Sequence, residues 1–141
     1  MSRCLFRRLA IALFLFTALT AFGQSAQFSA AYQTGTPTTQ DDNVTVTVST
    51  RVTNNGTADA SNVTITLANL TAQNQDYGSF PPVTVISGGG NVLLSQDFTV
   101  PKAVYDSWQN GGPVFSINYT LNGTSASQTI QATSVPEGQS L

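Results

Sequence analysis

Regular alternation of apolar and polar residues over Asn43–Leu70 restricts how this chain can fold more than any other feature. The apolar members fall on every second position on either side of a glycine-containing turn: Val44, Val46, Val48, Val52, Val63, Ile65 and Leu67. A period of two places these side chains on one face of a strand and the hydroxyls and amides between them on the other. Because one-sided sheets of this kind bury their apolar face against a second sheet, the sequence predicts an antiparallel β-sandwich.

The rest of the chain supplies enough shorter strand patterns for seven to eight strands in total. Expected strands cover residues 27–32, 83–85, 92–100, 115–121 and 126–135, while residues 36–42 and 71–82 are expected to be loops. Leu93 breaks the alternation of its strand and indicates a bulge or an edge. Asn122–Gly123 favours a type I′ hairpin turn, and the segment 101–113 fits one or two helical turns. This number of strands in a chain of this size favours an all-β, immunoglobulin-like antiparallel sandwich.

The chain divides into three parts. Residues 1–23 combine a basic start, the apolar run Leu9–Phe22 and small residues before Gln24, a pattern typical of a signal peptide. The competing interpretation, a membrane anchor, needs about 20 apolar residues, more than this run contains. Residues 24–135 are expected to form the sandwich and residues 136–141 a disordered tail. The product is therefore expected to be secreted or periplasmic, with no membrane attachment after cleavage of the signal peptide.

Composition argues against several classes of function. After residue 23 the chain keeps seven acidic side chains but only two basic ones, Arg51 and Lys102, so it offers no basic surface for nucleic acid or anionic lipid. It has no histidine, and its single cysteine, Cys4, lies in the predicted signal peptide. Disulfides and the commonest transition-metal ligands are thereby excluded from the domain, and no cofactor is expected.

No arrangement of residues indicates catalysis. A nucleophilic Ser needs a base, and without histidine the only side-chain amine in the domain is Lys102, which has no serine three residues before it. The acids fall on expected turns and tails, where solvated carboxylates are common. Calcium binding at residues 41–43 or 74–76 is an alternative, but neither segment has the spaced ligand pattern of a calcium loop. No catalytic, cofactor-binding or metal-binding residue is predicted, and the chain is not expected to be an enzyme.

One aromatic segment is a candidate ligand surface. Flat rings flanked by amides and acids hold the faces of sugars by stacking and hydrogen bonding. The candidate residues are Tyr105, Asp106, Trp108, Gln109 and Asn110, joined by Tyr77. The alternative, and the favoured one, is that Val104 and Trp108, four residues apart on a helical turn, cover the open end of the sandwich as a plug.

The segment Asn43–Pro101 resembles the bacterial immunoglobulin-like domains known as CARDB-type, "cell-adhesion-related domain in bacteria", modules. The likeness rests on the run from Val52 to Gly56, Val-Thr-Asn-Asn-Gly, followed by Ala60 and the pair Asn62–Val63. A glycine-rich turn then introduces a strand that ends in residues 98–101, Phe-Thr-Val-Pro. The resemblance implies a sandwich that serves as a spacer, an adhesion unit or an enzyme appendage.

Two functions are expected from these observations. The first is an exported, noncatalytic immunoglobulin-like module that acts in protein interaction or adhesion at the cell surface or outside the cell, with an exposed edge strand available to a partner. The alternative is a small carbohydrate-binding protein that uses the aromatic segment around Trp108. The expected partner is accordingly a protein or a glycan.

Overall fold

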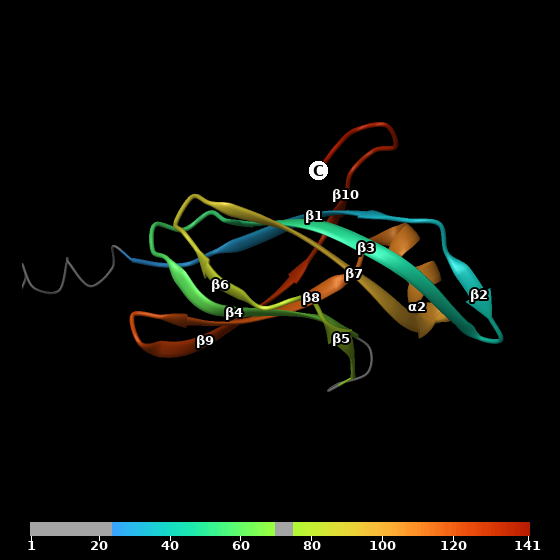
Figure 1. The fold of residues 1–141 in the computed structure, drawn as a ribbon, viewed down its shortest axis with the longest axis horizontal. Helices are drawn as coiled ribbons and strands as arrows, with labels where there is room; N and C mark the ends of the chain where they lie inside the picture. Colours follow the sequence, from blue (N-terminus) through green and yellow to red (C-terminus); the bar gives the residue numbers. More distant parts are fainter. Residues whose placement is uncertain (1–23, 70–74) are drawn as a thin grey trace, which may run out of the picture.

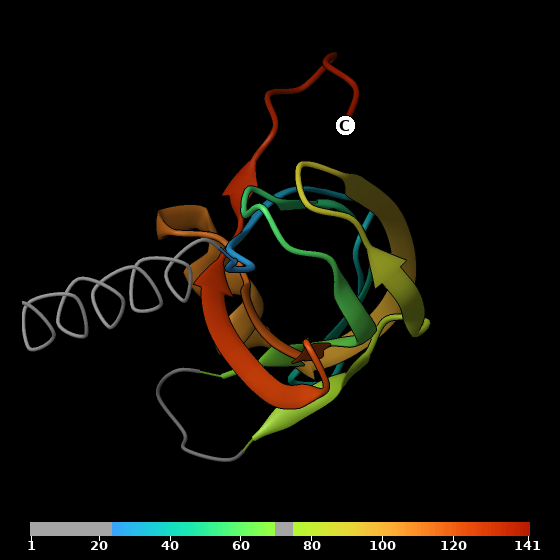
Figure 2. The ribbon, with the colours of Figure 1, turned by 90° about the vertical axis from the view of Figure 1, so that its left-hand side faces the viewer.

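A computed structural model describes residues 24–69 and 75–141 and shows two five-stranded sheets packed face to face (Figures 1 and 2). Sheet A contains β1 (Phe28–Thr34), β2 (Thr38–Gln40), β3 (Asn43–Asn54), β7 (Asn91–Pro101) and β10 (Thr133–Ser134). Sheet B contains β4 (Ala60–Ala68), β5 (Asp76–Ser79), β6 (Val83–Ile86), β8 (Val114–Leu121) and β9 (Thr124–Gln131). The predicted signal peptide lies outside the described residues.

The path of the chain gives the sandwich its immunoglobulin-like character. The chain crosses between the sheets after β3, after β6, after β7 and after β9. The crossing after β7 contains the helical elements α2 (Lys102–Ser107) and η2 (Trp108–Asn110). The described strands pair in antiparallel fashion, except that β10 lies parallel to β1. The predicted all-β immunoglobulin-like sandwich is therefore confirmed.

The central strand of sheet A follows the predicted alternation. Residues of β3 are alternately exposed and buried along its first half, and its inward valines lie in the core, with Val48 and Val52 both 0% exposed. Thr50 occupies an inward position among them and is also fully buried. Its hydroxyl donates a hydrogen bond of 2.7 Å to the backbone oxygen of Ala31, which satisfies the polar atom inside the core.

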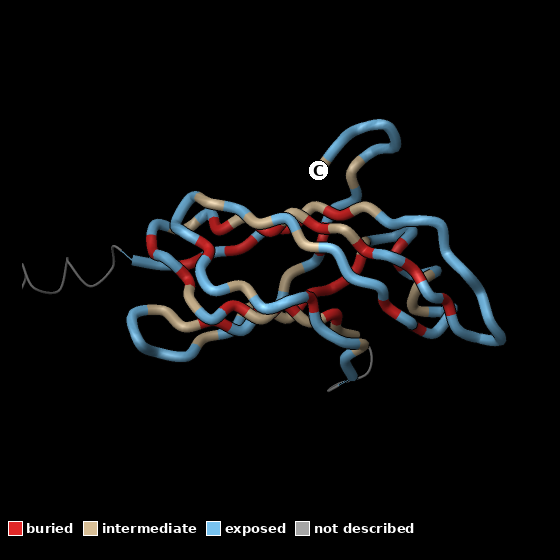
Figure 3. Tube along the Cα trace, viewed as in Figure 1, coloured by how far each residue is buried: buried red, intermediate tan, exposed pale blue. Residues whose placement is uncertain are grey.

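The core fills the space between the two sheets. Figure 3 shows the buried positions following the strands of both sheets, and the polar outer faces stay exposed. Aromatic rings join the two layers edge to face. Phe80, from the connection between β5 and β6, lies 5.0 Å from the ring of Phe98 and 5.4 Å from the ring of Phe115. Phe28 of sheet A meets Tyr119 of sheet B at 5.1 Å. These contacts bring both sheets into one apolar core.

The described residues form ten strands, more than the seven to eight that the sequence predicts. Three short strands lie in segments whose local patterns do not indicate a separate strand. β2 falls in the expected loop 36–42, β5 falls in the expected loop 71–82, and β10 separates from the longer strand expected over residues 126–135. β2 and β5 are formed by pairing with the long strands β3 and β4, a non-local interaction. The bulge, one of the two alternatives predicted at Leu93, is absent. β7 pairs with β3 in one continuous register from Asn91 to Pro101 and is an edge strand, which is the other alternative. Leu93 is exposed because it has the parity of the residues on the outer face of sheet A.

Two local predictions are confirmed. Asn122 and Gly123 have φ values of 50° and 79°, the two positive angles that a type I′ turn requires between β8 and β9. The helical turns expected in the segment 101–113 appear as α2 and η2.

The junction between β3 and β4 is held by Asn54, whose side chain is 0% exposed. Its amide nitrogen donates to the backbone oxygens of Ala58 at 2.8 Å and Ile86 at 3.2 Å. Its amide oxygen accepts from the backbone nitrogens of Gln27 at 3.3 Å and Gly56 at 3.0 Å. All four hydrogen-bonding positions of the amide are thus used. Asn54 connects the start of β1, the β3–β4 turn and the end of β6.

The last six residues, expected to form a disordered tail, make contacts with sheet A. The amide of Gln33 donates a hydrogen bond to the backbone oxygen of Gln139. The guanidinium of Arg51 donates one of 2.5 Å to the backbone oxygen of Leu141. The backbone of the preceding residue, Val135, also donates to Tyr32 on β1.

Candidate functional site

The candidate site is built on α2 and η2, at the end of the sandwich where β3 begins and β7 ends. Pro101 has φ −56° and ψ 142°, an extended conformation that ends β7 immediately before the helix. The backbone nitrogen of Lys102 then donates 2.8 Å to the backbone oxygen of Asp42, which fixes the helix to the start of β3. After η2 the chain turns at Gly112, where φ is 74° and an added Cβ would lie 2.1 Å from the backbone oxygen of Ala132. Only glycine fits this turn.

Trp108 is part of the core. Its side chain is 8% exposed and packs within the main hydrophobic cluster. Its backbone oxygen accepts a hydrogen bond of 3.4 Å from the hydroxyl of Tyr32. The ring therefore covers the end of the sandwich, as the plug interpretation expects, and it does not present a flat face to solvent.

Tyr105 is half-buried, and its ring meets the edge of Trp108 at 5.4 Å. Burial and, to a smaller extent, the neighbouring Tyr105 raise the pKa of the Tyr32 phenol above its ordinary value. These aromatic side chains border a shallow hollow of about 230 Å³. The hollow is lined by Tyr32, Thr34, Tyr105, Trp108, Gln109 and Ser134.

The hollow is uncharged. Its lining residues offer hydroxyls, one amide and ring edges, and none of them carries a carboxylate or an amine. Two adjoining hollows, of about 250 and 390 Å³, share Trp108 and are also lined by uncharged residues. Such a surface can hydrogen-bond a neutral ligand.

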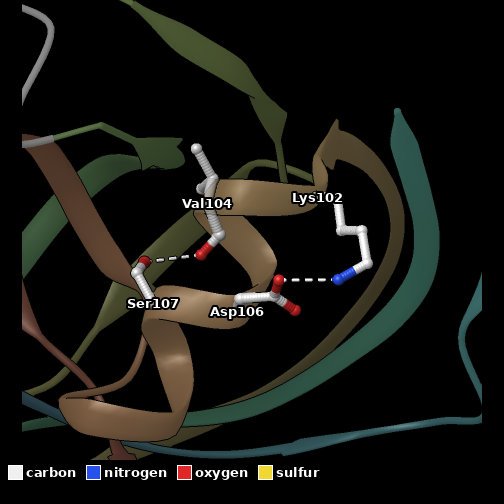
Figure 4. A network of polar contacts seen from close by, with 4 residues as sticks. All are labelled: Lys102, Val104, Asp106 and Ser107. Atoms are coloured by element: carbon white, nitrogen blue, oxygen red, sulfur yellow. Dashed lines mark hydrogen bonds and ion pairs between the residues drawn. The ribbon is translucent and has the colours of Figure 1, made fainter.

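The other candidate residues of this segment lie at its exposed surface. Gln109 and Asn110 are exposed, and Gln109 borders the hollow beside Tyr105. The Asp106 carboxylate forms an ion pair of 2.8 Å with Lys102 across one helical turn (Figure 4). This hydrogen bond raises the pKa of the exposed Lys102 amine.

Tyr77 lies on β5, away from the helix in sequence and half-buried against the core. Its hydroxyl accepts a hydrogen bond of 2.9 Å from the amide of Asn69. Asn69 also borders the hollow of about 390 Å³, next to Val104 and Trp108. The structure thus brings Tyr105, Trp108 and Gln109 together around one hollow, and it connects Tyr77 to a neighbouring hollow through Asn69. Sequence analysis missed Tyr32, because an inward tyrosine of a short strand is indistinguishable from an ordinary core residue.

The second candidate surface is the side of β7 that faces away from β3, which we call the β7 edge. β7 pairs with β3 along one side and with no other described strand. Near its end β5 approaches, since an added Cβ on Gly78 would lie 3.7 Å from the ring of Phe98. The stretch Asn91–Asp97 is therefore the open part of the edge. Leu93, 58% exposed, lies in it, and Val85 on β6 is 46% exposed; these are the exposed large hydrophobic residues of the described chain.

Residues 24–69 and 75–141 contain no group of three Asp, Glu, His or Cys side chains that could hold a metal ion. In the same residues, no helix has the length and apolar character needed to cross a membrane. The calcium alternative at residues 74–76 includes Asn74, which lies outside the described residues.

No family model and no curated protein matches the chain. Among solved structures it is similar to a GH20 exo-β-N-acetylglucosaminidase from Vibrio harveyi in complex with N-acetylglucosamine, with 13% identity, a TM-score of 0.36, and coverage of 79% of this chain and 18% of the enzyme. It is also similar to the structural genomics target SoR45, with 8% identity, a TM-score of 0.39, and coverage of 84% and 92%.

A protein from Archaeoglobus fulgidus gives 14% identity, a TM-score of 0.32, and coverage of 77% of this chain and 97% of that protein. The chain thus spans less than a fifth of the Vibrio harveyi enzyme, and these TM-scores are too low to support a functional argument.

Proposed function

We propose that this chain is an exported, noncatalytic immunoglobulin-like module that acts by protein interaction or adhesion at a bacterial surface or outside the cell. The observation that carries the proposal is the β7 edge. The open side of an edge strand offers a row of backbone donors and acceptors to an extended partner. The exposed Leu93 adds apolar contact area in the middle of that row. Export rests on the signal-peptide pattern of residues 1–23.

The rest of the described surface is consistent with this role. Outward side chains of β3 and β7 bond to each other across the sheet, with Thr45 and Thr99 at 2.8 Å and Ser49 and Ser95 at 3.1 Å. Between these two pairs the Thr47 hydroxyl donates to the Asp97 carboxylate, so the outer face beside the β7 edge is a row of small polar side chains that bond to each other.

Retention by cells tests the role directly. The purified protein is incubated with intact cells and with envelope fragments, and the bound fraction is measured after washing. Leu93→Lys is expected to reduce retention, because edge lysines oppose strand addition. Ser127→Lys introduces the same charge at an exposed position of β9 and is expected to leave retention unchanged. If neither cells nor fragments retain the unaltered protein, the proposed role is wrong.

A second candidate is favoured by the uncharged hollow beside Tyr105. Aromatic ring edges, hydroxyls and the Gln109 amide suit a neutral sugar. In this case the protein would co-sediment with an insoluble polysaccharide, and Gln109→Ala would weaken the binding. Gln75→Ala, which removes another exposed amide outside the hollow, is the matched control. Failure to co-sediment with any insoluble polysaccharide would count against this candidate.

A further inference from the structure

We propose that the partner of the β7 edge is a second copy of this chain, joined by antiparallel pairing of β7 with the partner's β7 over residues 91–95. The inference rests on the proposed interaction role and names the partner for that surface. Two sheets A would then form one continuous sheet across the interface. A module displayed at a surface would in this way bind an identical module on a neighbouring surface.

The backbone hydrogen bonds at both ends of β7 show which residues face the open edge. Asn54 nitrogen donates 2.8 Å to Gly90 oxygen at one end, and Lys102 nitrogen donates 2.8 Å to Asp42 oxygen at the other. Both bonds involve even-numbered residues on the β7 side, and the register between them is continuous. Hydrogen-bonded positions alternate along an antiparallel ladder. The backbone groups of the odd-numbered residues Leu93 and Ser95 are therefore directed away from β3, toward the open edge.

The sequence of this stretch is self-complementary in one register. If Leu93 lies opposite the partner's Leu93, then Val92 lies opposite the partner's Leu94 and Asn91 lies opposite the partner's Ser95. Each apolar residue meets an apolar residue, and each polar residue meets a polar one. Positions that share a parity stay on the same face of the joined sheet, so Leu93 pairs with its counterpart on the outer face and Val92 with Leu94 on the inner face.

Charge favours the same register. In residues 91–96 there is no charged residue, no proline and no bulge, which are the usual devices that protect an edge strand. Asp97 is the first charge along the strand, and its carboxylate already accepts a hydrogen bond from Thr47. With Leu93 at the centre, Asp97 lies opposite the partner's Gly89. The two copies therefore do not place their carboxylates opposite each other.

The other long edge strand, β9, is less open. It also lacks charge, but it lies beside β1, and the amide of Gln128 bridges the gap by donating 2.8 Å to Ala26 oxygen and accepting 3.1 Å from Phe28 nitrogen. This side of the sandwich is thus closed by contacts within the chain. The β7 edge remains the more accessible site for strand addition.

Sedimentation velocity across a wide range of protein concentrations tests the inference. We expect a reversible monomer–dimer equilibrium for the unaltered protein. Leu93→Lys places two lysines opposite each other and is expected to raise the dimer dissociation constant about tenfold or more, since roughly 1.4 kcal/mol corresponds to tenfold. Ser127→Lys is expected to leave the constant unchanged.

A second pair of variants tests the backbone pairing itself. Ser95→Pro removes a nitrogen–hydrogen group that faces the open edge and leaves the β3–β7 ladder intact, so it is expected to abolish the dimer while the monomer stays folded. Ser95→Ala keeps that group and is expected to dimerise normally. Circular dichroism of each variant checks the fold.

The outcomes separate this inference from the proposed function. If the protein stays monomeric at every concentration, yet is retained by envelope fragments, the proposal that its partner is a second copy is wrong and the interaction role stands. A dimer that Ser95→Pro and Leu93→Lys do not weaken overturns the β7 pairing. A monomeric protein that nothing retains overturns both.

Discussion

Replacing Asn54 by alanine should destabilise the domain more than any other single change of a polar side chain that the structure describes. The amide makes four hydrogen bonds, to Gln27, Gly56, Ala58 and Ile86, and is 0% exposed. Its removal leaves two backbone oxygens and two backbone nitrogens without these partners in a buried turn.

The magnitude follows from the number of bonds. At about 1 kcal/mol for each lost hydrogen bond, Asn54→Ala should cost about 4 kcal/mol, out of a total free energy of unfolding of about 5–15 kcal/mol for a domain of this kind. Asn54→Asp should cost at least as much, although it keeps the two acceptor contacts. Its buried carboxylate cannot donate to Ala58 and Ile86 and places a negatively charged oxygen against their carbonyl oxygens. The two variants together test whether the donor half of the amide matters.

Urea unfolding followed by the fluorescence of Trp108 measures the loss, since this single tryptophan lies in the core. Asn55→Ala is the matched control. Asn55 is the adjacent, exposed asparagine, with one side-chain bond of 2.9 Å to Ser29, and its replacement should cost about 0.5 kcal/mol or less. A cost below about 1 kcal/mol for Asn54→Ala would refute the reasoning. It would mean that the four backbone partners of Asn54 do not lose their hydrogen bonds in the variant.

Three further predictions follow from the same structure. Trp108 should emit at short wavelength and resist acrylamide quenching until the protein unfolds; red-shifted, easily quenched emission in the folded state would contradict its burial. Tyr32 has a raised pKa, so the folded state holds this proton more tightly than the unfolded state. Its contribution to stability is complete below the ordinary tyrosine pKa and is lost as pH rises through the raised one. Tyr32→Phe should therefore weaken the loss of stability at alkaline pH, measured by urea unfolding across that range, and an unchanged profile would contradict this. Gly56→Ala should destabilise by more than about 1 kcal/mol, because its Cβ would lie 2.1 Å from Ser25 oxygen. Gly35→Ala, whose nearest contact would be an ordinary 3.5 Å, should cost less in the same unfolding assay, and equal costs would argue against the clash.

Much of the fold could be predicted from the sequence because its information is local. The valines of β3 and the Asn122–Gly123 turn each determine their conformation through nearby residues. β2 and β5 could not be predicted, since their own residues are mostly polar and their strand character comes from pairing with β3 and β4.

The candidate sites also combine features that the local sequence indicates with features that depend on residues distant in the chain. The aromatic segment around Trp108 is visible in the sequence, but which ring is buried depends on packing against β1. Tyr32 joins that site from residues far away in the chain. Asn54 also reads as an ordinary turn residue next to Gly56, and its central role appears only when Ile86 and Gln27 come together around it.

The parallel pairing of β1 and β10 has a mechanical consequence. Ala31 lies beside Thr133 and Tyr32 beside Ser134, with the two strands running in the same direction. Tension that pulls Ala26 and Pro136 apart therefore acts along these strands. It loads their hydrogen bonds together, in shear, and cannot open them one after another as a zipper would. The bond of 3.0 Å from Val135 to Tyr32 extends the loaded stretch. A module held at both ends under flow would resist extension through this short clamp and would keep its β7 edge folded while under load.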